Sequence, residues 1–497
     1  MKNPIFSIKP LNVLILIAVI SSLIFLSSCT SKRPENKVLF PFYAAVGKEF
    51  DTIQYATGYM DEEGNVIFKP QFAPGGNPGG NPGEDYYYHI CGKCIYDYEK
   101  DDERRSLATA EFHENRAVFK NLSNWLYGYI DNTGKVVILP QYAKALPFSD
   151  GLAAVIIVNK TADGKPQVGY IDINGNMIIK PNESLVPNPF SEGLCLNVLE
   201  VNYSFPVYMN IPYLGYKYGI INKKGEIVVP PKFHAGMPFS EGRAAVFTEG
   251  ENRTVGWGFI DSTGNIVIPP KYMEVQSFSE GLAAALTVKP FNFSDFSDNS
   301  SEIGYYFRRQ QWQYIDKNGK VVIEPKVDLA LYNISYPLRC PIDLSFGSFH
   351  DGRAKFTVTY IDKTYTERCM DNDYQLKHAE DFYIDCEKDP APFFNRVGYI
   401  DKTGKVVIPP KFSDAGDFSE GLAYIRETYP GTYKHFSLYG FINVDGEKVI
   451  DYRLRMPADF HNGLAIFETI DYGRHMTLYI NKNGTVIIPK YTINASI

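Results

Sequence analysis

The stretch Gly128-Tyr-Ile-Asp-Asn-Thr-Gly-Lys-Val-Val-Ile-Leu-Pro140 decides the fold, because nearly the same sequence returns twice. It returns as Gly258-Phe-Ile-Asp-Ser-Thr-Gly-Asn-Ile-Val-Ile-Pro-Pro270 and as Gly398-Tyr-Ile-Asp-Lys-Thr-Gly-Lys-Val-Val-Ile-Pro-Pro410. An aromatic and β-branched run, an Asp-x-x-Gly turn and a second β-branched run are typical of a β-hairpin, and we expect the prolines to end its second strand. Weaker copies begin at six further positions: Gly58, Gly169, Gly219, Tyr314, Gly440 and Tyr479.

Every copy carries a glycine in its turn, where the backbone needs a positive φ. Gly134 and Gly175 are 41 residues apart, and Gly225 and Gly264 are 39 apart, so the basic period is about 40 residues. The nine turn glycines are Gly64, Gly134, Gly175, Gly225, Gly264, Gly319, Gly404, Gly446 and Gly484.

A second signature follows each hairpin and reads Phe-Ser-Glu-Gly in its commonest form. Its eighth copy, Phe112-His-Glu-Asn115, has Asn in place of Gly, which indicates a left-handed backbone at that position. The run Leu152-Ala-Ala-Val155 after one such turn predicts a third strand. The other copies begin at Phe148, Phe190, Phe239, Phe278, Phe349, Phe418 and Phe460.

These units predict an all-β protein made of about nine three-stranded repeats of ~40 residues, since one unit alone cannot bury its apolar face. Residues 42–46 resemble a lone third strand, and residues 478–491 resemble a hairpin that lacks one. If these two pieces share a sheet, the array closes into a β-propeller-like ring; an open β-solenoid is the alternative.

The first residues predict export. Lys2 and Lys9 precede an apolar run, and Leu26-Ser-Ser-Cys29 then resembles the bacterial lipobox. We therefore expect residues 1–28 to be a lipoprotein signal peptide and Cys29 to carry a membrane anchor of lipid. Residues 29–37 would form a linker to the repeat domain. Thr30 after the lipidated residue favours the outer membrane of a bacterial cell envelope.

Composition limits the partners. The formal net charge of the chain is −7, and the predicted signal peptide contains Lys2 and Lys9, so the mature chain is still more acidic. This argues against nucleic acid, which needs a basic face. The repeat domain is expected over 38–491, with insertions at 73–110 and 327–396 and a tail at 492–497.

The repeated pattern G-[YF]-I-[DN]-x-x-G followed by F-S-E-G-L-A resembles the bacterial WG-repeat (KWG-type) family. The resemblance covers roughly residues 38 to 491. The Trp-Gly pair survives at Trp257-Gly258, whereas Tyr127-Gly128 and Val397-Gly398 replace it elsewhere. The resemblance implies a β-rich interaction module and fixes no ligand.

Several polar positions are candidates for metal binding, pH sensing or recognition of a cationic partner. The Asp or Asn of each hairpin turn, such as Asp131, lacks the terminal Glu of a calcium loop, so we assign it to turn formation. His113, His350 and His461 replace the serine of the second signature, and an exposed turn residue is favoured over a metal or pH-sensing ring. The acidic residues beside them would line one rim, either to recruit a cationic partner or to keep the turns soluble: Asp150, Glu192, Glu241, Glu280, Asp351 and Glu420.

The cysteines divide into two kinds. Cys195 sits in a strand sequence and is expected to be a buried free thiol. The others are candidates for disulfides in the oxidising envelope, with zinc or redox chemistry at the first pair as the alternative: Cys91, Cys94, Cys340, Cys369 and Cys386.

No phosphate loop, nucleophile elbow or zinc-protease motif is present in the sequence. We therefore expect no catalytic residues, no resident metal and no cofactor, but a lipoprotein scaffold that binds protein or glycan partners. The alternative is an envelope hydrolase or glycan-processing enzyme, which needs convergent carboxylates in a site built across repeats.

Overall fold

The computed structural model describes fourteen stretches of the chain. All of them except Val38 belong to one compact unit, Leu39–Ile497. The described residues are 38–49, 52–72, 111–121 with 124, 126–158, 166–201, 216–250, 255–288, 310–332, 339–362, 393–426, 438–454, 457–471 and 474–490.

The described chain forms nine small antiparallel sheets in sequence order, which we number as blades 1 to 9. Blade 1 contains β1 (Phe40–Glu49), β2 (Thr52–Met60) and β3 (Val66–Phe72). Blade 2 contains β4 (Arg116–Lys120), β5 (Tyr127–Asp131) and β6 (Val136–Tyr142). Blades 3 and 4 contain β7 (Lys144–Ala145), β8 (Leu152–Val158), β9 (Pro166–Asp172), β10 (Met177–Asn182) and β11 (Leu194–Val201), β12 (Tyr216–Asn222), β13 (Ile227–Phe233).

The remaining five sheets repeat the same plan with three or four strands. Blades 5 and 6 contain β14 (Ala235–Gly236), β15 (Ala244–Glu249), β16 (Val255–Ile260), β17 (Ile266–Tyr272) and β18 (Glu274–Val275), β19 (Ala283–Val288), β20 (Gln310–Ile315), β21 (Val321–Ile323). Blade 7, after the 3-10 turn Leu329–Tyr332, contains β22 (Arg339–His350), β23 (Arg353–Asp362), β24 (Phe393–Asp401) and β25 (Val406–Phe412). Blades 8 and 9 contain β26 (Asp414–Ala415), β27 (Leu422–Arg426), β28 (Tyr439–Asn443), β29 (Lys448–Leu454) and β30 (Leu464–Asp471), β31 (Arg474–Asn481), β32 (Val486–Ile487).

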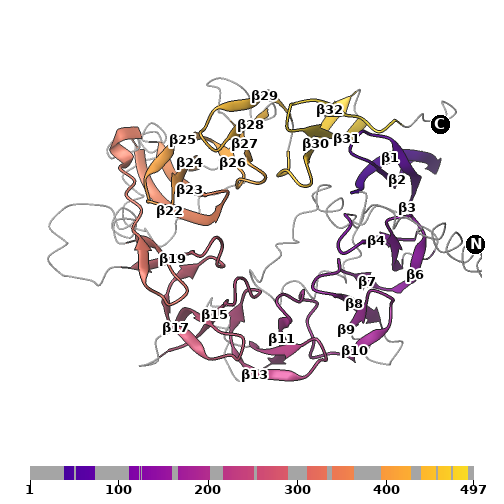
Figure 1. Ribbon diagram of the computed structural model, residues 1–497, viewed down its shortest axis with the longest axis horizontal. Helices are drawn as coiled ribbons and strands as arrows, with labels where there is room; N and C mark the ends of the chain where they lie inside the picture. The colour runs from indigo at the N-terminus through magenta and orange to yellow at the C-terminus, as the bar shows by residue number, and fades with distance from the viewer. Residues whose placement is uncertain are drawn as a thin grey trace, which may run out of the picture. The chain divides into compact units, whose positions relative to one another are not determined.

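The nine blades stand around a ring, as Figure 1 shows, with the last blade next to the first. The predicted nine-unit β-propeller-like ring is therefore confirmed, and the open solenoid is wrong. Within a blade the early long strand (β4, β11, β30) lies toward the centre of the ring and the last strand (β6, β13, β32) lies outside. Of the described residues, no helix is long and apolar enough to cross a membrane.

Strand pairing corrects the predicted repeat unit. The strand after the second signature pairs with the hairpin that follows it, as in Leu152↔Asp172, and not with the hairpin before it. The first and last pieces therefore do not share a sheet, because β1 pairs with β2 and β30 pairs with β31. Loop length does not decide this pairing, because β23 and β24 pair across the long connection 363–392. Residues 339–362 of the expected insertion also belong to blade 7 as β22 and β23.

The prolines lie inside the outer strand, which corrects a second expectation. Trp257 faces Tyr272 and Phe259 faces Ile268, so one residue of β16 opposes three of β17. This is a bulge, where Pro can sit because no ladder donor is lost. Gly258 lies opposite the bulge, and a Cβ there would be 2.5 Å from the carbonyl oxygen of Ile268. The glycine of the repeat is thus required by a close backbone approach.

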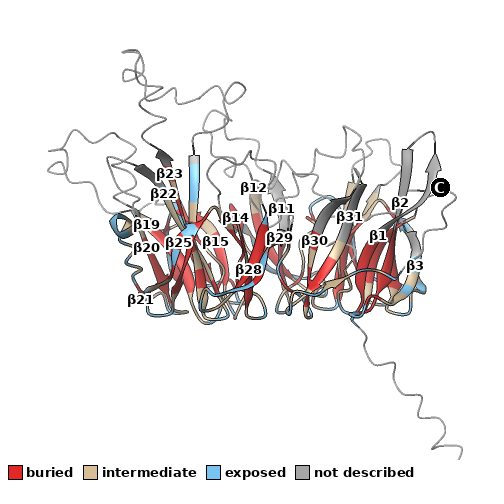
Figure 2. Ribbon diagram, turned by 90° about the horizontal axis from the view of Figure 1, so that it is seen from above, coloured by how far each residue is buried: buried red, intermediate tan, exposed pale blue. Residues whose placement is uncertain are grey.

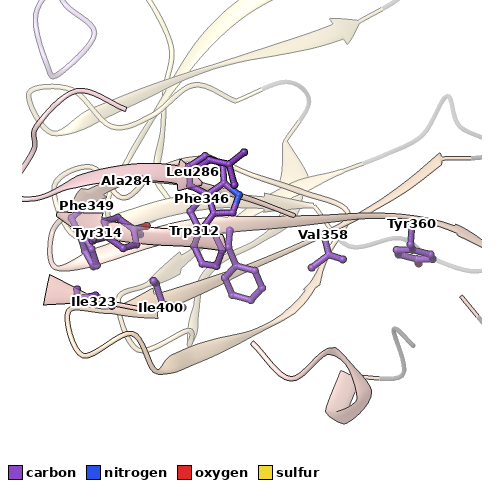
Figure 3. Close-up of a cluster of buried hydrophobic side chains, with 12 residues drawn as sticks. Ala284, Leu286, Trp312, Tyr314, Ile323, Phe346, Phe349, Val358, Tyr360 and Ile400 are labelled. Atoms are coloured by element: carbon purple, nitrogen blue, oxygen red, sulfur yellow. The ribbon is translucent and has the colours of Figure 1, made fainter. Parts of the chain in front are cut away.

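The core lies between blades. Figure 2 shows buried residues filling the body of the strands. Figure 3 shows one such layer, in which Trp312 and Tyr314 of blade 6 pack against Phe346 and Phe349 of blade 7. The Tyr314 and Phe349 ring centroids are 4.8 Å apart, a distance typical of favourable aromatic pairs. Because each sheet is covered on both faces, most of its middle strand is buried, as from Tyr127 to Ile130 in β5.

The turn glycines serve this stacking as well as the turn. All nine have positive φ, from 78° at Gly134 to 85° at Gly175, as the sequence pattern requires. At eight of the nine hairpin turns the glycine also lies close to the preceding blade. A Cβ on Gly225 would lie 3.0 Å from Ile179, and one on Gly404 would lie 2.6 Å from Ile323.

The seam between blades 9 and 1 repeats this contact across nearly the whole sequence. A Cβ on Gly64 would lie 2.5 Å from the Ile488 carbonyl oxygen, and the Lys490 N–H donates to the Gly64 carbonyl oxygen at 2.8 Å. The Tyr479 hydroxyl donates to the Pro41 carbonyl oxygen at 2.6 Å. In blade 3 the N–H of Leu146, just after the short strand β7, donates to the equivalent carbonyl oxygen of Ala154. Among its described residues blade 1 has no such strand, and the Tyr479 hydroxyl donates to this carbonyl instead.

We predict that Tyr479→Phe loosens blade 1, because it leaves the buried Pro41 carbonyl without its donor at a cost of about 1 kcal/mol. Hydrogen exchange should rise across β1 and β2. Tyr399→Phe is the matched control, since its hydroxyl donates to the Gly416 carbonyl oxygen at 2.6 Å between blades 7 and 8. Faster exchange in the Tyr479 variant that stays within blade 9 would contradict closure by this bond.

Candidate functional site at the inner turns

In blades 2 to 9 we call the long strand that follows the second signature the inner strand; these are β4, β8, β11, β15, β19, β23, β27 and β30. The second signature forms a tight turn just before this strand, which we call the inner turn. Ser149 and Leu152 exchange two backbone hydrogen bonds of 2.9 and 3.2 Å. The two residues between them, Asp150 and Gly151, have φ of 55° and 82°. Two positive φ values in a two-residue loop define a type I′ turn. The phenylalanine before it, Phe148, is buried between blades and anchors the turn.

Asn115 has a φ of 62°, which is the left-handed geometry that its replacement of glycine indicates. The residue before it has a positive φ too, and sequence reasoning missed this. That position is Glu114 at 51° and Glu192 at 54°, an unusual conformation for glutamate. A function must offset this strain.

The function is an inter-blade hydrogen bond that we call the clasp. The carboxylate of one inner turn accepts a hydrogen bond from the glycine N–H of the next inner turn. Glu192 accepts from Gly242 at 2.9 Å and Asp351 accepts from Gly421 at 2.7 Å. The clasp occurs at all seven steps from blade 2 to blade 9; the other five pairs are Glu114–Gly151, Asp150–Gly193, Glu241–Gly281, Glu280–Gly352 and Glu420–Gly463.

Other groups of the inner turn reinforce the clasp. The Ser191 hydroxyl donates to the Phe239 carbonyl oxygen of the next blade at 2.7 Å, and four more serines make the same bond. Four clasp carboxylates also form an ion pair with a lysine in the hairpin turn of the next blade, as Glu420 does with Lys482 at 2.9 Å. The acidic residues are thus fasteners between blades, which differs from both roles considered from the sequence.

Ring closure brings together two histidines that the sequence separates. Blade 1 has no inner turn among its described residues, so the turns of blades 9 and 2 flank it. His461 lies within electrostatic range of His113 and of Glu111. The pKa of His113 is lowered, first by burial and then by His461, and burial raises the pKa of Glu111. His350 lies on blade 7.

A second polar group lies just before the inner turns of blades 8 and 9. Asp417 forms an ion pair of 3.5 Å with Lys355 of blade 7. Asp459 is exposed on one side, yet its pKa is raised to about 6, because protein surrounds it and because Asp417 is close; Lys355 and His350 oppose the shift. Proline or serine occupies this position in the middle blades, as at Pro189. The two carboxylates lie within electrostatic range of each other.

We predict that Asp459→Asn removes a pH dependence of stability. A raised pKa favours the protonated folded state, so this group's contribution is fully present below about pH 4 and is lost as the pH rises through about 6. The variant should therefore gain in melting temperature over the wild type, by roughly 1 °C, at about pH 7.5 but not at about pH 4. Melting curves at both values check this, and an equal difference at both would contradict the titration.

The hairpin-turn acids form turns, as the sequence indicates. The Asp261 carboxylate accepts hydrogen bonds from the Thr263 and Asn265 N–H groups at 2.9 and 3.0 Å. Its pKa is lowered, first by the hydrogen bond from the Thr263 hydroxyl. In the described part of the chain no three His, Cys, Asp or Glu residues gather as metal ligands.

Most of the predicted cysteine chemistry lies outside the described residues, namely Cys29, Cys91, Cys94, Cys369 and Cys386. Cys340 lies in β22 opposite Ile361. Cys195 is a buried free thiol, and burial raises its pKa to about 11. The Tyr170 hydroxyl and the Asn197 amide surround it, so it is part of the core.

Comparison with known sequences supports the repeat. The family model described as "WG containing repeat" matches residues 127–160, 218–251, 257–286, 312–336 and 398–428. These matches fall on the hairpins of blades 2, 4, 5, 6 and 7, and four of them continue over the inner turn of the next blade. No curated protein sequence matches the chain.

Several solved structures resemble the ring. A crystal structure of the eukaryotic initiation factor is 12% identical with a TM-score of 0.46, and the match covers 90% of this chain and 94% of that one. The Pyrococcus horikoshii acylaminoacyl peptidase is 11% identical with a TM-score of 0.30, over 66% of this chain and 42% of that one. A puromycin hydrolase gives 10% identity and 0.30, over 70% and 53%. This chain thus spans about half or less of either hydrolase.

Proposed function

Because the chain belongs to the WG-repeat family, we propose that it is a lipid-anchored protein of the bacterial cell envelope whose propeller binds a protein or glycan partner without catalysis. The observation that carries the binding role is that the polar groups at one end of each blade are used in contacts between blades, whereas the other end carries connections of variable length. The inner turns and hairpin turns lie at one end, the turn face, and their polar groups bond to neighbouring blades. The opposite end, the loop face, is left for recognition.

Chain topology supports this division. The inner strand runs away from its turn, so the segment joining it to the middle strand leaves from the loop face. These segments differ greatly in length: residues 472–473 join β30 to β31, whereas residues 363–392 join β23 to β24. A rigid scaffold with variable connections on one side is a common arrangement for recognition.

Photocrosslinking from the two faces tests the binding role. A benzoylphenylalanine at Phe394, which is 45% exposed at the start of β24, should capture envelope components in living cells. The matched control replaces Lys405, an exposed residue of a hairpin turn. Adducts at residue 405 with none at residue 394 would place recognition on the turn face and overturn this proposal.

The anchor supplies the location. We predict that Cys29→Ser abolishes labelling by a fatty-acid probe and leaves unprocessed precursor, because the serine hydroxyl cannot replace the thiol that takes the diacylglyceryl group. Cys94→Ser is the control and should keep its label. Flotation of membranes and density separation of inner from outer membranes then report where the mature chain resides. Normal labelling of the Cys29 variant would refute the lipobox assignment.

One observation favours the alternative of an envelope hydrolase. Asp417 and Asp459 lie close to each other, and a carboxyl group with a pKa of about 6 is suited to donate a proton. Asp417 is bound to Lys355, which is equally consistent with a structural network. Release of fragments from purified peptidoglycan that Asp459→Asn abolishes would establish this activity.

A further inference from the structure

The clasp gives the inner turns a defined ligand chemistry. At seven turns, the backbone N–H of the second positive-φ residue donates to a carboxylate from the preceding turn. The N–O distances of the hydrogen bonds of normal length run from 2.7 Å at Gly421 to 3.2 Å at Gly352. Successive backbone N–H groups in a turn can form a concave nest that binds anions. The repeated contact therefore identifies the turn as a carboxylate receptor.

The eighth turn keeps this geometry and lacks the carboxylate. In blade 2, Glu114 and Asn115 have φ of 51° and 62°, which match Asp150 and Gly151 in blade 3. No residue that the structure describes accepts a hydrogen bond from the Asn115 N–H, and Asn115 is exposed. The Glu114 carboxylate is used in the forward clasp to Gly151.

The sequence explains why the carboxylate is missing. The clasp acid stands two residues before the first residue of the inner strand, as Asp150 does before Leu152. Strand register makes Leu39 the equivalent of Leu152, since Phe40 faces Met60 as Ala153 faces Ile171. Two residues before Leu39 the sequence has Lys37, whose side-chain ammonium cannot accept a hydrogen bond.

The surroundings of the Asn115 N–H suit an anion more than those of the other turns do. His113 and His461 lie within electrostatic range of each other there, whereas five of the other turns have serine at this position. Arg116 follows directly and donates to the carbonyl oxygens of Asn115 and Ile173. Glu111 and Glu114 are the acids that face the histidines.

We propose that the inner turn of blade 2 binds a carboxylate of an acidic partner peptide, held by the Asn115 N–H beside His113 and His461. The seven internal ligands are aspartate and glutamate side chains, so an acidic peptide side chain reproduces the native chemistry. This site lies on the turn face, so the inference goes beyond the recognition role proposed for the loop face. Its failure would leave the tests of the anchor and of the loop face unaffected.

A titration of one amide tests the site. The mature full-length chain in detergent micelles, labelled with ¹⁵N at asparagine, is titrated with acetyl-Gly-Glu-Gly-amide and separately with acetyl-Gly-Gln-Gly-amide. The Asn115 signal, assigned by its loss in Asn115→Gly, should move saturably with the glutamate peptide alone. The double variant His113→Ser/His461→Ser should bind roughly two- to fivefold more weakly, and the control His350→Ser should bind equally well.

A second variant tests whether an inner turn binds a carboxylate, independently of blade 2. Glu192→Gly removes one clasp acid, suits its positive φ and vacates the Gly242 N–H. In that variant, labelled with ¹⁵N at glycine, Gly242 should respond to the glutamate peptide. A response at Gly242 with none at Asn115 would overturn the assignment to blade 2. No response at either amide, or a response at Asn115 to glucuronate but not to the peptide, would overturn the proposal.

Discussion

Gly258→Ala should lower the free energy of unfolding by roughly 3 kcal/mol, one of the two largest losses that we expect from a single small substitution. The new Cβ would lie 2.5 Å from the Ile268 carbonyl oxygen and 2.8 Å from the Pro270 nitrogen. Both are backbone atoms of the bulge, and the proline ring fixes their conformation further. The bulge must open or the ladder between β16 and β17 must shift, because no side-chain rotation relieves the clash.

Gly347→Ala is the matched control. Gly347 has no positive φ, and a Cβ there would find its nearest atoms at 3.6 Å, an ordinary contact. We expect its cost to stay within about 0.5 kcal/mol. Urea denaturation of both variants measures the difference. Equal losses would show that the glycine of the repeat is not required by the backbone approach that the bulge creates.

Gly404→Asn should cost roughly 2 kcal/mol, although the same change at Gly421 should cost less than about 1 kcal/mol. Both glycines have strongly positive φ, 80° and 87°, so the backbone strain of asparagine is shared. They differ in their surroundings. A Cβ on Gly404 would lie 2.6 Å from the Ile323 side chain, which is buried and β-branched, whereas one on Gly421 would meet nothing within 4 Å.

Gly404→Val extends this series, because a β-branched residue adds strain to the clash and should be the least stable of the three. Thermal melts of the three variants, run together, check the order. From the turn pattern alone Asn would be a mild replacement at any of these glycines, as it is at position 115. Similar melting temperatures for Gly404→Asn and Gly421→Asn would show that blade stacking tolerates a side chain at the hairpin turn.

The repeat itself determined the secondary structure. Alternation of β-branched and aromatic residues, turn glycines at a fixed offset and small residues after the inner turn are local signals, and each acts through neighbours along the chain. The same signals predict nine blades, because each copy of the motif makes one hairpin. The positive φ at Asn115 could be inferred for the same reason.

Assignment of strands to blades needed the tertiary structure. The inner strand can pair with the hairpin before it or after it, and the sequence of one repeat is the same in both cases. Only the registers, such as Leu152↔Asp172, distinguish them. The seam followed from this choice, since blades 9 and 1 meet through Tyr479, Pro41 and Gly64 and not through a shared sheet.

What the sequence by itself determined is therefore the kind of each element, the turns and the number of blades, because these depend on local backbone preferences. What only the tertiary structure decided is the role of the polar residues. Glu192 accepts from Gly242, fifty positions away, and His461 lies near His113 across the seam. Such contacts depend on the angle between stacked blades and on ring closure, and no local pattern encodes either.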